Sequence, residues 1–306
     1  MTKKAASILA GDLKLLFQRG VNISAHLREV LGEEANTREI IELSYEVQAG
    51  SYVQAMQDPS IAKHKKKYAC LVADEVLALC RPRSVLEAGV GEATTLGFLI
   101  ERLGASSQYY GFDLSWSRVA YGRKWLSEMS VDGVELCTGD LLHMPYLDSS
   151  IDVVYTSHSI EPNGGREEEI IRELVRVARK YVVLLEPAYE LASDEAKARM
   201  DAHGYCKSLV KTAQDLGLSV IKHELFPYSI NPLNPTGITI IEKACDNEVK
   251  QVGVYCCPST RTPLRNIRDV LYSDESLLAY PVIGGIPCLR QEHAVLASYM
   301  NEVGDA

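Results

Sequence analysis

The sequence lacks any CxxC pair, although its 306 residues include eight cysteines. Cysteines paired at that spacing are typical of zinc sites and redox motifs, so their absence favours ordinary reduced thiols. The cysteines are scattered, several of them within apolar runs, at Cys70, Cys80, Cys137, Cys206, Cys245, Cys256, Cys257 and Cys288. We therefore expect buried thiols in a cytoplasmic protein, without a metal site.

The sequence also has no apolar run approaching the roughly 18 residues of a membrane span. Its N-terminal stretch, MTKKAASILAGDLKLLF, has no continuous apolar segment and no clear cleavage site, so no signal peptide is expected. The net charge of −9 disfavours general binding to nucleic acid or anionic membranes, because those partners reward clustered lysine and arginine. A small molecule is the expected partner.

Three regions follow one another along the chain. Residues 1–80 place apolar residues at helical spacing and predict a helical extension, which ends at RPRS because proline breaks a helix. Within it, the charge run HKKKY (His64 to Tyr68) predicts a solvated helix face. Residues 81–245 alternate strands with helices, including one helical stretch from Asp194 to Gly217. This alternation predicts a mostly parallel α/β sheet covered on both faces.

The end of the second region differs from the rest. Its last two predicted strands, LSVIKHELF and TGITIIEKA, are separated only by PYSINPLNP and could therefore pair in an antiparallel way. A polar, linker-like stretch follows around Cys245 to Val249. The third region, residues 250–306, predicts a small module of short strands joined by turns.

The stretch EAGVGEA, from Glu87 to Ala93, follows the first predicted strand of the sheet. Gly89 and Gly91 would let the backbone approach a ligand, and ligands bind at the carboxyl ends of parallel strands. A dinucleotide fingerprint would need a third glycine where Thr94 stands. Glu87 would moreover repel a pyrophosphate. The turn therefore favours a cationic ligand without phosphate.

The same stretch resembles motif I (E/D-x-G-x-G-x-G) of the class I S-adenosylmethionine-dependent methyltransferases, with Ala93 in the last small position. Asp113 ends the second strand, 26 residues after Glu87, where an acid can accept both ribose hydroxyls; a solvated acid is the alternative. Asp140 ends the third strand and resembles the acid that bonds the adenine amino group. Leu141 would offer its backbone N–H to the ring.

The resemblance covers about residues 60 to 243. It also includes the loop MPYLDSS before the fourth strand, and it assigns cofactor contacts to Leu114 and Ser157. It implies S-adenosyl-L-methionine as cofactor and a Rossmann-like fold of seven strands with an antiparallel last pair.

The stretch TSHSIEPNGGREEE follows the fourth strand, where members of this family place groups that face the substrate. His158 could act as general base on a hydroxyl or amine, or could pack over the cofactor or cap a turn. Glu161 could instead take the proton or hold a cationic amine, and Asn163 belongs to the following turn. Arg166 at a helix start opposes the helix dipole, so it predicts a ligand carboxylate or phosphate, or a salt bridge.

Further residues could line the acceptor pocket. Family members often use an N-terminal helical segment as a lid, so Tyr45 and Tyr52 could face the site; packing in the core is the alternative. Tyr189 lies in EPAYELAS after the fifth strand, beside other predicted wall residues such as Glu186. Asn231 and Asn234 belong to the stiff loop NPLNPTG before the last strand.

The third region resembles the short zinc-ribbon-like family that includes a methyltransferase activator subunit. The resemblance rests on the start CCPST and on the later AYPVIGGIP. Cys257 and Pro258 keep the start, but Thr260 stands where a second cysteine would be. Zinc needs about four soft or imidazole ligands, so none is predicted. We expect a stabilising module fused in the same chain, which could also form a homodimer.

These observations predict an S-adenosylmethionine-dependent methyltransferase that acts on a small polar acceptor by in-line transfer to oxygen or nitrogen. The combination of TSHSIEPNGG with NPLNPTG is similar to methyltransferases of bacterial surface-glycan or nucleotide-sugar pathways. The activator-like module suggests tRNA or protein methylation as an alternative. The acidic chain, and SHSI at Ser157–Ile160 in place of an NPPY-type tetrapeptide, disfavour it. A non-catalytic subunit that binds the cofactor is the other alternative.

Overall fold

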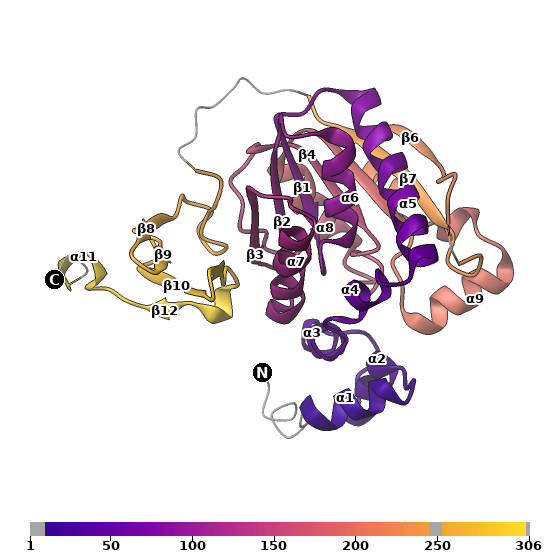
Figure 1. Ribbon diagram of the computed structural model, residues 1–306, viewed down its shortest axis with the longest axis horizontal. Coiled ribbons are helices and arrows are strands. Elements are labelled where there is room, and N and C mark those ends of the chain that lie inside the picture. The colour runs from indigo at the N-terminus through magenta and orange to yellow at the C-terminus, as the bar shows by residue number, and fades with distance from the viewer. Residues whose placement is uncertain (1–9, 230, 245–252, 304–306) are drawn as a thin grey trace.

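A seven-stranded sheet forms the centre of the computed structural model, which describes residues 10–229, 231–244 and 253–303 (Figure 1). Its strand order is β3-β2-β1-β4-β5-β7-β6. The strands are β1 (Ser84–Ala88), β2 (Gln108–Asp113), β3 (Val134–Thr138), β4 (Ile151–Ser157), β5 (Ala178–Pro187), β6 (Ser219–Leu225) and β7 (Thr236–Glu242). Strands β1 to β5 pair in parallel, whereas β7 runs antiparallel to β5 and β6. The predicted sheet with its antiparallel last pair is confirmed.

Helices cover both faces of this sheet. They are α5 (Pro59–Leu79), α6 (Thr94–Leu103), α7 (Trp116–Glu128), α8 (Glu167–Val177) and α10 (Leu209–Asp215), while α9 (Asp194–His203) contacts the short segment Tyr189–Leu191 that follows β5. Neighbouring residues of β1 belong to different cores, because successive strand side chains point to opposite faces. Val85 packs with residues of α5, α6 and α7, and Leu86 packs with residues of α8 and α10. The continuous helix expected from Asp194 onward is wrong, because Gly204 adopts a left-handed conformation and ends α9.

Four helices of the N-terminal extension form a separate group at one end of the sheet (Figure 1). They are α1 (Ala10–Gln18), α2 (Ile23–Leu31), α3 (Arg38–Val47) and α4 (Ser51–Ala55). Helices α1, α2 and α3 share a small core of their own, which includes Leu13, Leu27 and Ile40. Side-chain caps from Asn22 and Thr37 start α2 and α3, as expected of residues that accept the free backbone N–H groups of a first turn.

The C-terminal module is a second, small sheet that lies beside β3 (Figure 1). It contains β8 (Arg265–Ile267), β9 (Val270–Tyr272), β10 (Leu278–Ile283), β11 (Ile286–Pro287), β12 (Val295–Leu296) and the short helix α11 (Met300–Val303). The predicted β-rich module is thus present, while its likeness to zinc ribbons and its dimerisation stay predictions. The linker expected at 245–249 lies outside the described residues. No helix in the described part of the chain is long and apolar enough to cross a membrane.

Candidate active site

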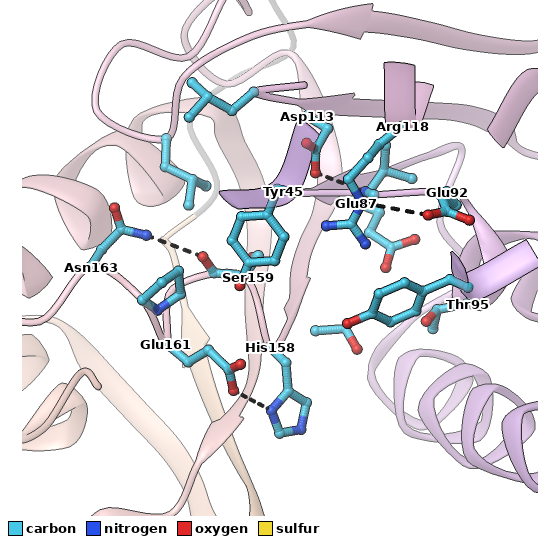
Figure 2. Close-up of a pocket in the computed structure, with 18 of the residues that line it drawn as sticks. Tyr45, Glu87, Glu92, Thr95, Asp113, Arg118, His158, Ser159, Glu161 and Asn163 are labelled. Atoms are coloured by element: carbon cyan, nitrogen blue, oxygen red, sulfur yellow. Dashed lines mark hydrogen bonds and ion pairs between the residues drawn. The ribbon is translucent and has the colours of Figure 1, made fainter. Parts of the chain in front are cut away.

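A cavity of about 350 Å³ lies at the carboxyl ends of the central parallel strands. Figure 2 shows the side chains that converge on it. The expected cofactor residues that line it are Glu87, Gly89, Gly91, Asp113, Leu114, Asp140, Leu141 and Ser157. The expected catalytic and acceptor residues that line it are His158, Glu161, Tyr45, Tyr52, Asn163, Arg166, Asn231 and Asn234. Tyr189 is not among the lining residues; its hydroxyl donates to Asp201 Oδ2 at 3.2 Å.

The glycine turn after β1 allows two close approaches that a side chain would prevent. Gly89 has φ +79°, and a Cβ there would lie 2.2 Å from the Cβ of Ser159. Gly91 has φ +54°, and a Cβ there would lie 2.7 Å from Nη2 of Arg118. The backbone N–H of Gly91 donates to Asp113 Oδ2 at 2.9 Å. The two glycines therefore bring the ends of β1, β2 and β4 together around one cavity.

The carboxylate of Glu87 ends β1 inside the protein, with only 2% of the residue exposed. Burial raises its pKa to about 8, although a hydrogen bond from Tyr155 and the nearby Lys65 ammonium both favour the ionised form. The Tyr155 hydroxyl donates to Glu87 Oε2 at 2.8 Å. A cationic ligand group would stabilise the carboxylate that burial disfavours.

Two further acids follow along the edge of the sheet. Besides its bond from Gly91, Asp113 accepts the backbone N–H of Ser115 at 3.0 Å. Asp140 accepts the backbone N–H of Leu142 at 2.9 Å and an Arg38 Nη1–H at 3.1 Å. These bonds fix both carboxylates at the rim of the cavity, where their remaining lone pairs can accept hydroxyl or amino donors from a ligand.

Arg118 of α7 is a cavity residue that the sequence pattern did not single out. Its guanidinium lies between two aromatic rings, 5.0 Å from the ring centre of Tyr45 and 4.7 Å from that of Tyr52. Only 8% of the residue is exposed, and within the described residues its Nε has no hydrogen-bond partner. The nearest carboxylate oxygen, from Glu92, is 3.9 Å from Nε (Figure 2). Such a buried cation is suited to an anionic ligand group.

Glu92 attaches the N-terminal extension to the glycine turn. Its buried carboxylate accepts the backbone N–H of Gly50 at 3.0 Å and of Val53 at 2.7 Å. Those N–H groups belong to the start of α4, where a negative charge is favourable. The extension thus forms a wall of the cavity, while its role as a lid stays a prediction.

The expectation of a solvated HKKKY face is wrong for two of its residues. Lys65 and Tyr68 both line the cavity, and the Tyr68 hydroxyl lies 3.0 Å from Ser157 Oγ. The two residues stand one helical turn apart, in line with Val72 and Val76, which are buried against the sheet. Burial lowers the pKa of the Lys65 ammonium, and the charge of Glu87 opposes that change. The charged residues of this stretch gave no sign in the sequence that one side of α5 faces the cavity and the sheet.

His158 begins a turn after β4, in a left-handed conformation with φ +56°. Its Nδ1 lies 2.8 Å from Glu161 Oε2 (Figure 2), and its Nε2 lies 2.8 Å from Thr236 Oγ1. Burial alone would lower the pKa of the imidazole, but the hydrogen bond and the charge of Glu161 raise it above its ordinary value. Asn234 Nδ2 donates to the same Glu161 oxygen at 3.3 Å. The ring is therefore fixed in position by partners on both nitrogens.

Glu186, near the end of β5, holds the backbone of the turn that follows β4. Its carboxylate accepts the backbone N–H groups of Ser159, Ile160 and Glu161 at distances of 3.1, 3.2 and 3.1 Å. Burial raises the pKa of Glu186 to about 7, and the neighbouring His158 acts in the opposite direction. The sequence indicated Glu186 only as a wall residue, because the three amide partners lie more than twenty residues earlier in the chain.

The remaining expected acceptor residues lie on loops around the mouth of the cavity. Asn163 Nδ2 donates to the carbonyl oxygen of Ser159 at 3.2 Å. Asn231 Oδ1 accepts the backbone N–H of Leu233 at 3.0 Å, which rigidifies the loop before β7. Arg166 precedes α8 as its N-cap residue and lines the cavity.

Known proteins are similar to the central part of this chain. Residues 85–181 match the family described as "Methyltransferase domain". A candidate O-methyltransferase from Nostoc punctiforme superposes with a TM-score of 0.50 at 13% identity, over 65% of this chain and 60% of that one. Magnesium protoporphyrin IX methyltransferase from Synechocystis gives a TM-score of 0.47 at 18% identity, over 58% of this chain and 83% of that one.

At these identities, the structural likeness speaks only for the fold. The matched domain runs from β1 into the start of β5, and it therefore includes the glycine turn and the three acids of the sheet edge. Residues 85–181 thus match a methyltransferase domain, and the chain has the fold of a known methyltransferase-like protein around its cavity.

Proposed function

We propose that the protein transfers a methyl group to a hydroxyl or amine of a small polar acceptor, with His158 as general base. One observation carries this proposal. The His158 imidazole, fixed by Glu161, shares a cavity with Glu87 and the glycine turn. A base beside the donor site is needed only when the acceptor atom carries a proton that it must lose.

The residues around the cavity fit S-adenosyl-L-methionine as the methyl donor. Glu87 would hold its ammonium group, Asp113 its ribose hydroxyls and Asp140 its adenine amino group. The buried guanidinium of Arg118 would hold its carboxylate, which supplies the partner that Nε lacks among the described residues. The bound donor supplies an activated methyl group for in-line displacement, so the protein has mainly to align the reactants and exclude water.

His158 is arranged to accept a proton. A carboxylate only accepts hydrogen bonds, so Nδ1 donates to Glu161 and the neutral ring keeps its lone pair on Nε2. Thr236 Oγ1, 2.8 Å from Nε2, marks the side from which the proton of the acceptor would arrive. Glu161 would then stabilise the imidazolium that forms.

The acceptor side of the cavity is polar. It is lined by the amides of Asn163, Asn231 and Asn234, the hydroxyl of Thr236 and the guanidinium of Arg166. A ligand rich in hydroxyl groups would satisfy these donors and acceptors, which supports a sugar or nucleotide sugar as the acceptor class. Methylation of RNA or protein is the alternative that an acceptor screen must include.

The test begins with calorimetric titration of S-adenosylmethionine, where absence of binding would refute the proposal. Methyl transfer is then screened over sugars, nucleotide sugars, amines, RNA and proteins. For the accepted class, His158→Ala should lose about 100-fold or more in turnover while it keeps its donor affinity. His223→Ala is the matched control, because His223 bonds Thr239 at 3.0 Å and does not line the cavity. Full activity of His158→Ala would exclude His158 as the general base.

A further inference from the structure

The C-terminal module reaches the N-terminal extension and the donor site through Arg290. The residue is 3% exposed. Its Nη1 and Nη2 donate to Glu42 Oε1 and Oε2 at 2.5 and 2.8 Å, and Nη1 also donates to the carbonyl oxygen of Leu114 at 3.2 Å. Glu42 belongs to α3, whereas Leu114 follows directly after Asp113. One guanidinium therefore holds three segments that are far apart in the sequence.

The module is well placed to hold Arg290 there. Leu289 donates its backbone N–H to the carbonyl oxygen of Thr138 at 3.1 Å, at the end of β3. On the other side of the module, Trp116 Nε1 donates to the Ile283 carbonyl oxygen at 3.3 Å, and Arg123 Nη1 donates to that of Gly284 at 2.6 Å. These contacts dock the turn between β10 and β11 on α7, so Arg290 projects from a fixed backbone.

A second branch leads from the module to Asp140. Arg290 Nη2 donates to Glu292, and Arg38 Nη2 lies 3.4 Å from the same carboxylate. Arg38 Nη1 in turn donates to Asp140 at 3.1 Å. Positive and negative side chains thus alternate from the module to the acid at the end of β3. Leu114 and Asp140 line the cavity, whereas Arg290 does not.

We propose that the C-terminal module helps to form the donor pocket. Arg290 is the positioning residue for the part of the pocket that would hold the adenosine of the donor. The inference rests on the proposed donor contacts of Asp140 and its neighbours. Arginine suits this role because its planar fork can bond a carboxylate in a bidentate way and still reach a carbonyl. Glu46 binds Ser115 and Ser117 from the C-terminal end of α3. Arg290 holds the same helix nearer its middle, through Glu42.

The test compares Arg290→Met with Arg265→Met in the full chain. Arg265 is the control, because it forms an exposed ion pair with Asp274 within the same module. We expect Arg290→Met to raise the Kd for S-adenosylmethionine about tenfold or more, the effect typical of supports behind ligand-binding groups. Turnover at saturating donor should stay within about twofold of the parent, since Arg290 does not touch the reacting atoms. Arg265→Met should bind like the parent.

Glu42→Gln provides a second route if Arg290→Met folds poorly. It removes the charge partner on α3 and should raise the Kd in the same direction, and the double variant should be no weaker than the weaker single variant. If the parent chain binds the donor and the variants bind it with an unchanged Kd, this inference is overturned, even if the melting temperatures of the variants fall. That result would leave the proposed function untouched. A parent chain that does not bind the donor would instead refute the proposed function.

Discussion

Tyr155 donates its hydroxyl to Glu87 from the neighbouring strand, across 2.8 Å. The two residues are register partners in the parallel pair of β4 and β1, and both are buried. The hydrogen bond fixes the direction of the carboxylate and favours its charged form, but burial has the larger effect on the pKa. Glu87 is thus held in place by the sheet while it lacks a full counter-charge.

Donor binding should therefore release protons. With a pKa of about 8, the free carboxyl of Glu87 is mostly protonated at pH 7 and must ionise to pair with the donor ammonium. Calorimetry at pH 7 in buffers of different ionisation enthalpy should detect release of most of one proton, and the affinity should rise from pH 6 towards pH 8.

Two variants check the source of that proton. Glu87→Gln should abolish the release and weaken binding. Tyr155→Phe removes a bond that favours the carboxylate, so the rise in affinity should move to higher pH. Equal proton release from the parent and Glu87→Gln would assign the proton to another group.

Gly89→Ala should destabilise the protein because of a specific collision. The new Cβ would lie 2.2 Å from Ser159 Cβ, at a backbone φ of +79°. We expect the free energy of unfolding to fall by about 2 kcal/mol or more, measured by chemical denaturation. Gly104→Ala is the control, because φ is +86° there and nothing lies within 4 Å, so only the backbone strain remains.

The collision can also be relieved directly. Adding Ser159→Gly to Gly89→Ala removes the contacting Cβ and should recover part of the lost stability. Failure of the double variant to recover any stability would show that strain at φ +79°, rather than contact, dominates.

Arg118→Met should reduce affinity for the donor through its carboxylate. Loss of charge-assisted hydrogen bonds costs about 2 kcal/mol, or roughly thirtyfold in Kd. Methionine keeps an apolar chain between Tyr45 and Tyr52, so the packing is largely preserved. Decarboxylated S-adenosylmethionine is the matched ligand, and its affinity should be almost unchanged in the variant. Equal losses for both ligands would mean that Arg118 has only a structural role.

The pH dependence of turnover should report His158. Its pKa lies above the ordinary imidazole value, so kcat/KM should rise with pH as the ring loses its proton. Glu161→Gln removes the charge that stabilises the imidazolium, so the midpoint of this rise should move to lower pH. Initial rates over a pH series for parent and variant measure both effects. A midpoint that does not move would separate His158 from the observed titration.

The sequence predicted those parts of the site that depend on local order along the chain. Glu87, Asp113 and Asp140 each stand at or just beyond a strand end, and parallel strands bring such ends to one edge. The antiparallel last pair followed likewise from a short connection between two strands.

Other site residues could not be found in this way, because tertiary packing decides their surroundings. Arg118 lies inside a helix of low amphipathicity, and Lys65 lies within a charge run whose inner face shows only against the sheet. Arg290 stands far along the chain from every group that it holds at the donor site.

The three amide bonds to Glu186 restrict what the acceptor can be. Three successive N–H groups after a strand would otherwise form a natural receptor for phosphate. Here an internal carboxylate already occupies the amides of Ser159, Ile160 and Glu161 and adds its own negative charge. A phosphorylated acceptor could not bind its phosphate to these backbone N–H groups and would have to present it to the arginines at the cavity rim. A neutral polyol would meet no such restriction.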